Sequence, residues 1–511
     1  MQPRYRLSAI KDASALNLDL KPKQVSAWLK RLPLSNPLQA ADELADYLAT
    51  ANRAKMGHDL RARMVGLLDS VVDETVTALR EQFVSAPLPL APRLHPNPEL
   101  AQRLLLELAT AYKILILSWL GQTFRLSKKP LARYLQRLLL CLQQLLEISY
   151  ETHDNVPDGV WVDLHQTYNY ALRSGLADAI PEDSKAMLSA EQIYKGILLM
   201  ALADPYRFTQ IELLWAKDII ARFSNLAEIF PAEASRGHDG IFMIDVNTDV
   251  PPKPLAWEQY PTDPRWDLIL NTTELAKHMA MLSTHVKAKE DPEKLGLPAA
   301  ARDPEYAVML HRLKLSWGAS TLRQSQRRRH QRGKEFEVGF GLRSVYQLIG
   351  PVAGERHLVS APGDPPPMVM RCTTVDDSMG GLALRKSGTI SAQVKVGDLV
   401  GVHQDNGSWS VGLVRWFRVP KEGELFFGIQ LLAPRAHAVH VRRNDTGKQY
   451  LSLLLQASPT LKQSAMLLAP PGSIEPDSPI DVRSNAGQVS IRVEKRLEYT
   501  PNVEVFRITV A

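Results

Sequence analysis

The stretches 369–382, VMRCTTVDDSMGGL, and 409–432, WSVGLVRWFRVPKEGELFFGIQLL, decide the fold of the second half of the chain. Short runs rich in valine, leucine and aromatic residues, interrupted by glycine, are typical of β-strands. Asp405-Asn406-Gly407 predicts a tight hairpin turn, because asparagine and glycine accept the positive φ that such a turn needs. The strands predicted in this region are 369–375, 399–403, 409–417, 425–432 and 437–442. Together they predict a small antiparallel β-barrel.

The β-rich character continues to the last residue. Further strands are predicted at 449–456, 488–496 and 503–510. This C-terminal extension could be a second barrel or a dimerisation surface.

The first half of the chain has a helical pattern. Apolar residues recur at intervals of three and four, the spacing of an amphipathic helix, in the segments 37–55, 60–83, 99–120, 126–152, 165–175, 189–202 and 206–230. A proline-rich stretch at 85–98 interrupts the series. The pattern predicts an α-helical array or bundle.

The middle of the chain is mixed, with a short β-like run from 241 and helices predicted at 275–289 and 305–323. Because helices come first and strands second, we expect separate domains. The fold class is therefore a multidomain α + β protein. Its predicted parts are an all-α helical array or bundle (1–240), a mixed linker with a connecting helix (241–322), an antiparallel β-barrel with an N-terminal arginine arm (323–434) and a β-rich extension (435–511).

Length and composition narrow the class of protein. With 511 residues, 45% of them hydrophobic and 23% charged, the chain is an ordinary globular protein with more than one core. Its two cysteines, Cys141 and Cys372, lie far apart and exclude a disulfide scaffold, which favours a reducing compartment. The most apolar stretch, 104–120, is interrupted by Glu107 and Lys113 and is too short to cross a bilayer. We therefore expect a cytoplasmic protein that does not span a membrane.

Positive charge is concentrated in one segment. Residues 306–334 contain eight arginines or lysines and no acidic residue, so the remainder of a chain of net charge +6 sums to −2. A protein that coats nucleic acid usually spreads its basic surface more widely. A single short basic segment instead favours a small anionic ligand.

Two motifs can supply the contacts for such a ligand. In QRRRHQRG (326–333), Arg328 and Arg332 are spaced as RxxxR, and in DDSMGGL (376–382), Asp376, Ser378 and Gly381 are spaced as DxSxxG. A guanidinium can bond two phosphate oxygens, or O6 and N7 of a guanine, with one planar fork. A carboxylate can accept from guanine N1 and N2, and a hydroxyl adds a short contact. Both motifs therefore suit a cyclic dinucleotide that carries two phosphates and two guanines.

An RxxxR segment followed by a small barrel that carries [DN]xSxxG resembles the PilZ domain, the bacterial receptor for cyclic di-GMP. The flanking runs GLALRKSG, VGDLVGV, WSVGLVRWFR and FFGIQLL extend the resemblance over roughly 323–434. The resemblance implies that Arg328 and Arg332 lie on an arm that folds over cyclic di-GMP. It also implies that Asp376, Ser378 and Gly381 form the part of the site on the barrel. Gly380 would keep the approach to the ligand free of a side chain.

The arginine arm has more than one possible register. Arg323 and Arg327 form a second RxxxR, but Arg328 and Arg332 lie closer to the first strand. Arg327 could add a contact to the ligand. The separation between Arg332 and Asp376 is longer than expected for the family, and an insertion near 350–367 would explain it.

Other kinds of site find no support in the sequence. His437 and His440 fall on opposite faces of one predicted strand, so no metal site is expected. The glycines of GFGLRS (339–344) lack the third glycine and the βαβ context of a dinucleotide-binding loop. No phosphate-loop, HExxH or GxSxG motif occurs, and we expect neither an enzyme nor a cofactor.

Two functions compete at this stage. The first is a cyclic di-GMP effector whose arm orders on binding and thereby alters a protein–protein interaction, in which an unidentified partner contacts the helical half. The PilZ resemblance implies regulation of motility, adhesion, pili or biofilm. The alternative is an adaptor or nucleic-acid-binding protein with a degenerate PilZ fold that binds no ligand. The absence of aromatic residues among the arginines speaks against nucleic acid, because base stacking needs them.

Overall fold

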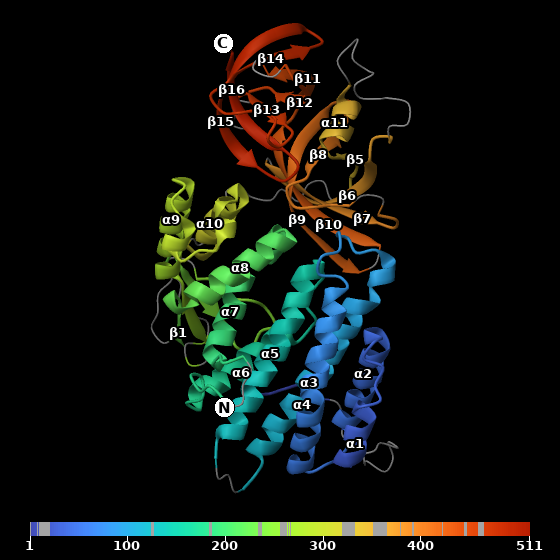
Figure 1. The fold of residues 1–511 in the computed structure, drawn as a ribbon, viewed down its shortest axis with the longest axis vertical. Coiled ribbons are helices and arrows are strands. Elements are labelled where there is room, and N and C mark those ends of the chain that lie inside the picture. Colours follow the sequence, from blue (N-terminus) through green and yellow to red (C-terminus); the bar gives the residue numbers. More distant parts are fainter. Residues whose placement is uncertain are drawn as a thin grey trace. The chain divides into compact units, whose positions relative to one another are not determined.

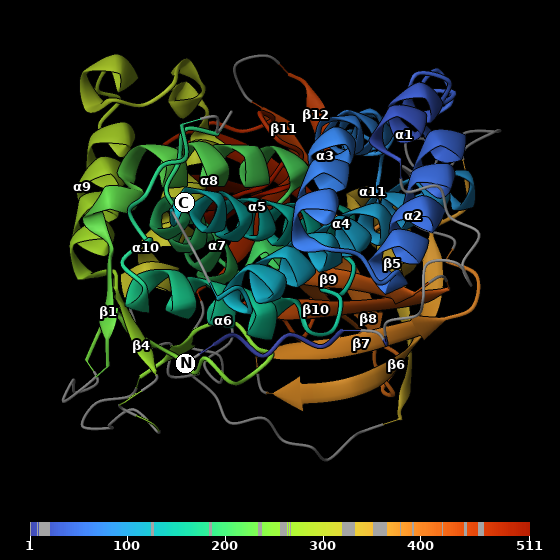
Figure 2. The same cartoon turned by 90° about the horizontal axis from the view of Figure 1, so that it is seen from below.

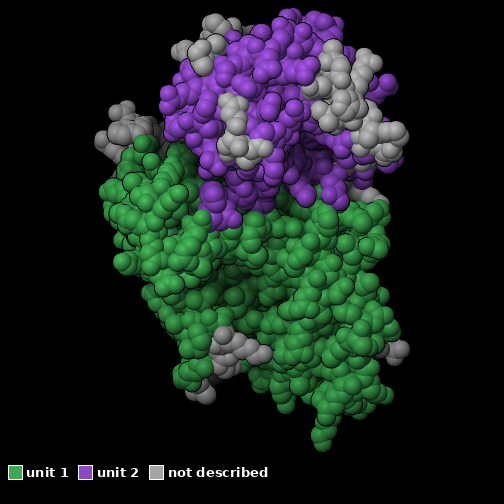
Figure 3. Space-filling view, turned by 45° about the horizontal axis from the view of Figure 1, so that its top comes forward, with its two compact units in different colours: residues 1–205, 210–302, 306–321 green, residues 206–209, 303–305, 322–511 purple. Residues whose placement is uncertain are grey.

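A computed structural model describes residues 2–7, 9, 21–123, 127–182, 186–232, 238–255, 263, 265, 267–318, 333–350, 365–378, 380–390, 393–421, 423–443, 447–457 and 464–510. The chain forms two compact units, coloured separately in Figure 3. We call residues 1–205, 210–302 and 306–321 the helical unit, and residues 206–209, 303–305 and 322–511 the barrel unit.

The helical unit begins with a series of helices, of which all but the first, α1, overlap segments that the sequence predicts to be helical (Figure 1). They are α1 (Pro22–Leu29), α2 (Pro37–Arg53), α3 (His58–Glu81), α4 (Pro96–Leu120), α5 (Lys129–Thr152), α6 (Val160–Arg173), α7 (Ala190–Leu202) and α8 (Gln210–Phe223). Local signals set several of the starts: proline occupies the first helical turn of α2, and Ser189 and Gln192 form a capping box on α7. Of the helices in the described ranges, none is long and apolar enough to cross a membrane.

The core of this unit is built around α4 and α5. Helix α4 packs against α2, α3 and α5, and Figure 2 shows α2, α3 and α4 side by side. Leu104, Leu105 and Leu108 of α4 are fully buried, as are Leu138 and Leu142 of α5. Each such side chain contributes on the order of 1.5–3 kcal/mol relative to exposure. Cys141 is buried among them, as a structural thiol would be.

The helical unit ends with a small sheet and two further helices. The sheet has the strand order β1-β4-β2-β3, with β1 (Glu228–Pro231), β2 (Ile241–Ile244), β3 (Lys253–Pro254) and β4 (Leu268–Asn271). Helices α9 (Thr273–Lys287) and α10 (Pro304–Gly318) follow it. The predicted helix 206–230 is wrong at its end, because residues from Glu228 onward pair with β4 as a strand. Pairing with a strand forty residues away overrides the local helical pattern there.

The first barrel of the barrel unit is closed, with the strand order β10-β7-β6-β5-β8-β9. Its strands are β5 (Glu335–Phe340), β6 (Val369–Ser378), β7 (Gly381–Ser387), β8 (Leu399–His403), β9 (Trp409–Lys421) and β10 (Glu424–Ala433). The predicted hairpin between β8 and β9 is confirmed, since Gly407 has a φ of +77°. Helix α11 (Leu342–Ile349) follows β5 and was not expected from the sequence.

The β-rich extension is a second closed barrel, with the strand order β11-β12-β13-β16-β15-β14. Its strands are β11 (Ala436–Arg443), β12 (Gln449–Leu455), β13 (Met466–Ala469), β14 (Pro479–Ser484), β15 (Gly487–Tyr499) and β16 (Glu504–Val510). The two faces of β11 pack against different hydrophobic clusters. Val439 and Val441 belong to the interior cluster of the second barrel, whereas Ala436 and Ala438 belong to a second cluster.

That second cluster joins the two barrels. It combines residues of the first barrel and α11 with residues of the second, among them Tyr346, Leu413, Leu453 and Val505. At its edge the hydroxyl of Tyr346 hydrogen-bonds to Nε2 of His440 at 2.8 Å, and both side chains are buried. The two barrels therefore share this buried cluster, which we call the shared core, and pack as a single structural body.

Candidate ligand site on the first barrel

The DxSxxG motif forms the hairpin between β6 and β7. Ser378 pairs with Gly381 and Asp376 pairs with Ala383, with a β-bulge between Thr374 and Asp376. The hydroxyl of Ser378 donates to the carbonyl of Gly381 at 3.3 Å. Bulges re-aim the side chains that follow them, which is a common feature of strands beside functional sites.

A shallow cavity of about 210 Å³ lies against this hairpin. Asp376, Ser378, Gly380 and Gly381 line one side of it, so the structure brings together all the predicted site residues of this motif. Strands β9 and β10 supply the other side, with side chains that the sequence did not single out. These are Arg415, Trp416, Gly428, Ile429 and Gln430.

Glycine is required where the strands come closest. A Cβ atom on Gly381 would lie 2.5 Å from the backbone oxygen of Ile429 in β10, which is closer than real Cβ atoms come to any atom. A Cβ on Gly428 would overlap the indole ring of Trp416. Gly380 is different, because nothing lies within 4 Å of its Cβ position. Gly381 therefore has a packing role, whereas Gly380 leaves open space beside the cavity.

The described part of the cavity combines both signs of charge. Asp376 and Asp377 contribute carboxylates, and Oδ1 of Asp377 has no hydrogen-bond partner among the described residues. Arg415 is the cationic side chain of the described lining. Its Nε donates to Oε1 of Gln430 at 2.7 Å, and its terminal nitrogens bond both carboxylate oxygens of Glu498. Such a bidentate pair fixes the plane of the guanidinium as well as its position.

Residues 353–438, which contain this hairpin and most of the first barrel, match the family model described as "Cyclic-di-GMP receptor FimW, middle PilZ domain". The chain contains a PilZ domain. Residues 23–233 match the model for the N-terminal domain of the same receptor, and residues 436–511 match the model for its C-terminal beta-barrel domain. The three matches follow one another along the chain and together take in most of both units.

Comparison with curated proteins agrees with these matches. The chain is 23% identical to the "Cyclic-di-GMP receptor FimW" of Pseudomonas aeruginosa over 527 residues, covering 88% of this chain and 84% of that protein. No solved structure matches the chain.

The arginines predicted for the arm of the PilZ domain, Arg327, Arg328 and Arg332, lie outside the described residues. Gly333 is the first described residue after them, and its N–H donates to the carbonyl of Thr374 at 3.0 Å. In return, Thr374 N–H donates to the carbonyl of Lys334 at 2.8 Å. The residue that follows the RxxxR motif is therefore attached to β6 two positions before Asp376.

Arg415 and Trp416 line the PilZ cavity although the sequence did not identify them as site residues. Both lie in the run WSVGLVRWFR, which was interpreted only as a strand. A β-bulge in β9 opposite Gly428 and Ile429 breaks the simple alternation of faces there. For this reason, strand periodicity alone could not assign Arg415 to the cavity side.

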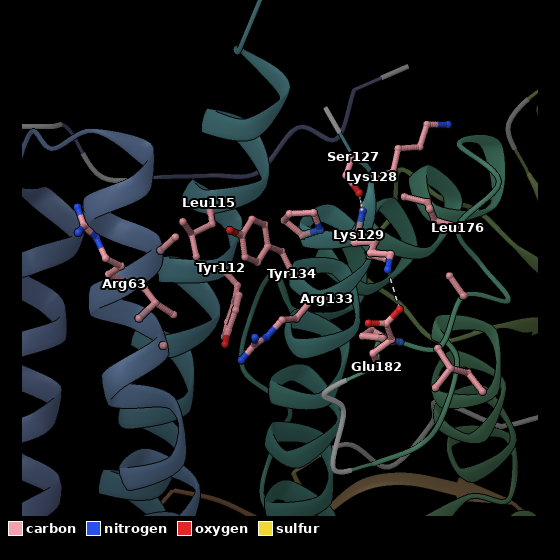
Figure 4. Close-up of a pocket in the computed structure, with 18 residues that line it drawn as sticks. Arg63, Tyr112, Leu115, Ser127, Lys128, Lys129, Arg133, Tyr134, Leu176 and Glu182 are labelled. Atoms are coloured by element: carbon pink, nitrogen blue, oxygen red, sulfur yellow. Dashed lines mark hydrogen bonds and ion pairs between the residues drawn. The ribbon is translucent and has the colours of Figure 1, made fainter. Parts of the chain in front are cut away.

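A larger cavity of about 750 Å³ lies within the helical unit (Figure 4). Apolar side chains and aromatic rings, including Tyr112 and Tyr134, line it together with Arg63 and Arg133. Lys129 forms an ion pair with Glu182 beside it at 2.6 Å. None of the site residues predicted from the sequence contributes to this cavity. Among the described residues, no group of three or more histidine, cysteine or acidic side chains is placed to hold a metal ion.

Proposed function

We propose that this protein is a receptor for cyclic di-GMP and that the cavity beside the β6–β7 hairpin is its binding site. The observation that carries the proposal is the arrangement of Asp376, Ser378 and Gly381 around one cavity of a PilZ barrel. The relative from Pseudomonas aeruginosa, which is named as a receptor of this ligand, supports the same function.

Each motif has a distinct role in this proposal. The carboxylate of Asp376 accepts from N1 and N2 of a guanine, and Ser378 adds a hydroxyl contact. Arg328 and Arg332, with Arg327 beside them, bond the phosphates and the O6 and N7 atoms of guanine. The attachment of Gly333 to Thr374 supports this arrangement, because it places the end of the arginine segment close to the carboxylate.

Binding is read out by a protein partner rather than by a chemical reaction. The helical unit, which matches the N-terminal domain of a receptor, is the surface that the partner contacts. We infer that the protein acts in the cytoplasm, where the second messenger is made, and that it regulates motility, adhesion, pili or biofilm formation. Ordering of the arginine arm links ligand binding to that surface.

Calorimetric titration of the full chain with cyclic di-GMP tests the proposal. We expect saturable binding by the wild type, with GTP and cyclic di-AMP inactive. Asp376→Ala and Arg332→Ala should each weaken binding at least about tenfold, the loss expected when a charged hydrogen-bonding partner is removed. Matched controls lie on the second barrel: Asp481→Ala, whose carboxylate accepts from Ser490, and the exposed Arg442→Ala.

The controls separate a specific site from a general effect of charge. Equal loss of binding in Arg332→Ala and Arg442→Ala would indicate a nonspecific electrostatic attraction, which salt should also abolish. Wild-type protein that binds no cyclic di-GMP, but binds nucleic acid in a salt-sensitive manner, would refute the receptor and favour the degenerate PilZ adaptor.

A further inference from the structure

Arg415 connects the ligand cavity with the second barrel. Its side chain lines the cavity on β9, and its bidentate partner Glu498 belongs to β15 of the other barrel. The Nη2–Oε2 distance is 2.8 Å. The two side chains are 25% and 24% exposed, so three quarters of each is out of water, unlike a typical surface ion pair.

Both members of the pair are placed by β-bulges. The register of β9 shifts opposite Gly428 and Ile429, where Arg415 is the extra residue. The register of β15 shifts between Arg496 and Glu498. A bulge turns a side chain away from the direction that regular alternation would give it. Here the two bulges direct a cation and an anion from different barrels toward each other.

Arg415 retains donors for a ligand while it is held in this way. A guanidinium has five N–H groups. Among the described residues, one of them donates to Gln430 and two donate to Glu498, which leaves one N–H on each terminal nitrogen. The rest of the described lining carries the negative charges of Asp376 and Asp377. A ligand with two phosphates therefore needs a cation at this wall to offset the repulsion.

We propose that Arg415 is a ligand-binding residue of the PilZ cavity and that Glu498 is its positioning residue, so that the second barrel is a working part of the binding site. The inference rests on the proposed function, and it names a contribution to affinity from a residue outside the PilZ domain. Glu498 holds the guanidinium in one orientation beside the cavity, which keeps the remaining N–H groups available to a ligand. Without Glu498, the ligand itself must immobilise the long side chain when it binds.

The shared core makes this positioning rigid. Leu413, two residues before Arg415, is buried in the cluster that contains residues of both barrels. Asn502, four residues after Glu498, donates to Oδ1 of Asp398 at 2.5 Å, directly before β8 of the first barrel. These contacts fix the two backbones on either side of the ion pair. A fixed distance between them keeps Arg415 preorganised before the ligand arrives.

The test is calorimetric titration of the full chain with cyclic di-GMP for the wild type, Arg415→Gln, Glu498→Gln and the double variant. We expect Arg415→Gln to lower affinity on the order of tenfold, because it removes a charged donor. Glu498→Gln should lower affinity about two- to tenfold, the effect of freeing one long side chain. The double variant should bind no more weakly than Arg415→Gln, because Glu498 acts only through Arg415.

Glu475→Gln is the matched control, since Glu475 pairs with Arg443 at 3.2 Å on the same barrel but does not line the cavity. Melting temperatures of all variants establish that they fold. Binding that Asp376→Ala abolishes but Arg415→Gln and Glu498→Gln leave unchanged would overturn this inference and leave the receptor function intact. Tighter binding by Glu498→Gln would also overturn it, because the carboxylate would then oppose the ligand. Wild-type protein that binds no ligand would overturn both proposals.

Discussion

Replacement of Gly381 by alanine tests whether the close approach of β7 and β10 shapes the binding cavity. The added Cβ would lie 2.5 Å from the backbone oxygen of Ile429, whereas ordinary contacts begin at 3.4 Å. The obstacle is backbone, so no side chain can rotate out of the way. The two strands must therefore separate locally by about 0.9 Å.

The size of the effect follows from that displacement. A separation of this size stretches a hydrogen bond of ordinary length beyond its working range, and losing one costs about 1 kcal/mol. Overpacking strain adds on the order of 1–3 kcal/mol. For a unit of this size, each kcal/mol lowers the melting temperature by about 2–4 °C. The total of about 2–4 kcal/mol predicts that the barrel unit of Gly381→Ala melts roughly 4–16 °C below the wild type.

Gly380→Ala is the matched control. Its Cβ would meet nothing within 4 Å, so its melting temperature should stay close to that of the wild type. Scanning calorimetry measures both transitions, and titration with cyclic di-GMP measures the ligand site. Gly381→Ala should also weaken ligand binding, because the strand separation displaces Ser378, its pairing partner. Equal melting temperatures and equal affinities for the two variants would refute the steric reasoning.

Three further predictions concern stability. Burial lowers the pKa of His165 to about 4, so the neutral side chain stabilises the fold fully above the ordinary pKa of 6.5, and this stability is lost as pH falls toward 4. The free energy of unfolding of the helical unit, measured with urea, should fall by up to roughly 3 kcal/mol across this range. His165→Gln should remove this pH dependence. Burial raises the pKa of Asp398 to about 6, so the stability that its protonated form contributes is present below the ordinary value of 3.8 and is lost as pH rises through 6. Asp398→Asn should therefore flatten the decline in the unfolding free energy of the barrel unit with rising pH. An unchanged slope of unfolding free energy against pH would contradict this assignment. Tyr346→Phe removes the hydroxyl bonded to buried His440 and should lower the urea midpoint by an amount equivalent to about 1–3 kcal/mol, whereas an unchanged midpoint would mean that the bond adds no net stability.

Much of the fold was predictable because its local signals agree with its long-range packing. Strand β8 occupies the predicted residues Leu399–His403, and the hairpin after it contains the predicted turn. The amphipathic helices were predictable for the same reason, since one wide apolar face buries against neighbouring helices. The sequence did not decide whether the C-terminal extension forms a second barrel. One reason is that β13 (Met466–Ala469) is only four residues long and buried on both faces. Such a short run gives no alternation to detect.

Helix α11 illustrates what the sequence could not reveal. Its residues LRSVYQLI include valine, tyrosine and isoleucine, which favour strands when considered locally. They form a helix because Val345 and Tyr346 bury in the cluster between the barrels. A cluster of this kind depends on residues more than a hundred positions away, including Val505. Tertiary packing decided the structure here, and no window of local sequence contains that information.

The candidate site also contains residues that local sequence could predict and residues that it could not. Asp376, Ser378 and Gly381 are close in sequence, so their motif could be recognised before the structure was known. Arg415 could not be recognised in this way, because its role depends on the pairing of β9 with β10 and on a carboxylate in another barrel. Contacts between distant strands carry no local signature.

The shared core of the two barrels determines where a ligand signal can travel. Strand β9 supplies Arg415 to the cavity and, through Val411 and Leu413, two side chains to the core between the barrels. Packed cores deform little, so a shift of β9 on ligand binding must be taken up by the second barrel as well. That route requires no residue of the arginine arm. The proposed arm contact and the β9 route are therefore separable by mutation. Arg332→Ala would remove the proposed contact of the arm while leaving Arg415 paired with Glu498, whereas Glu498→Gln would release Arg415 and leave the arm unchanged.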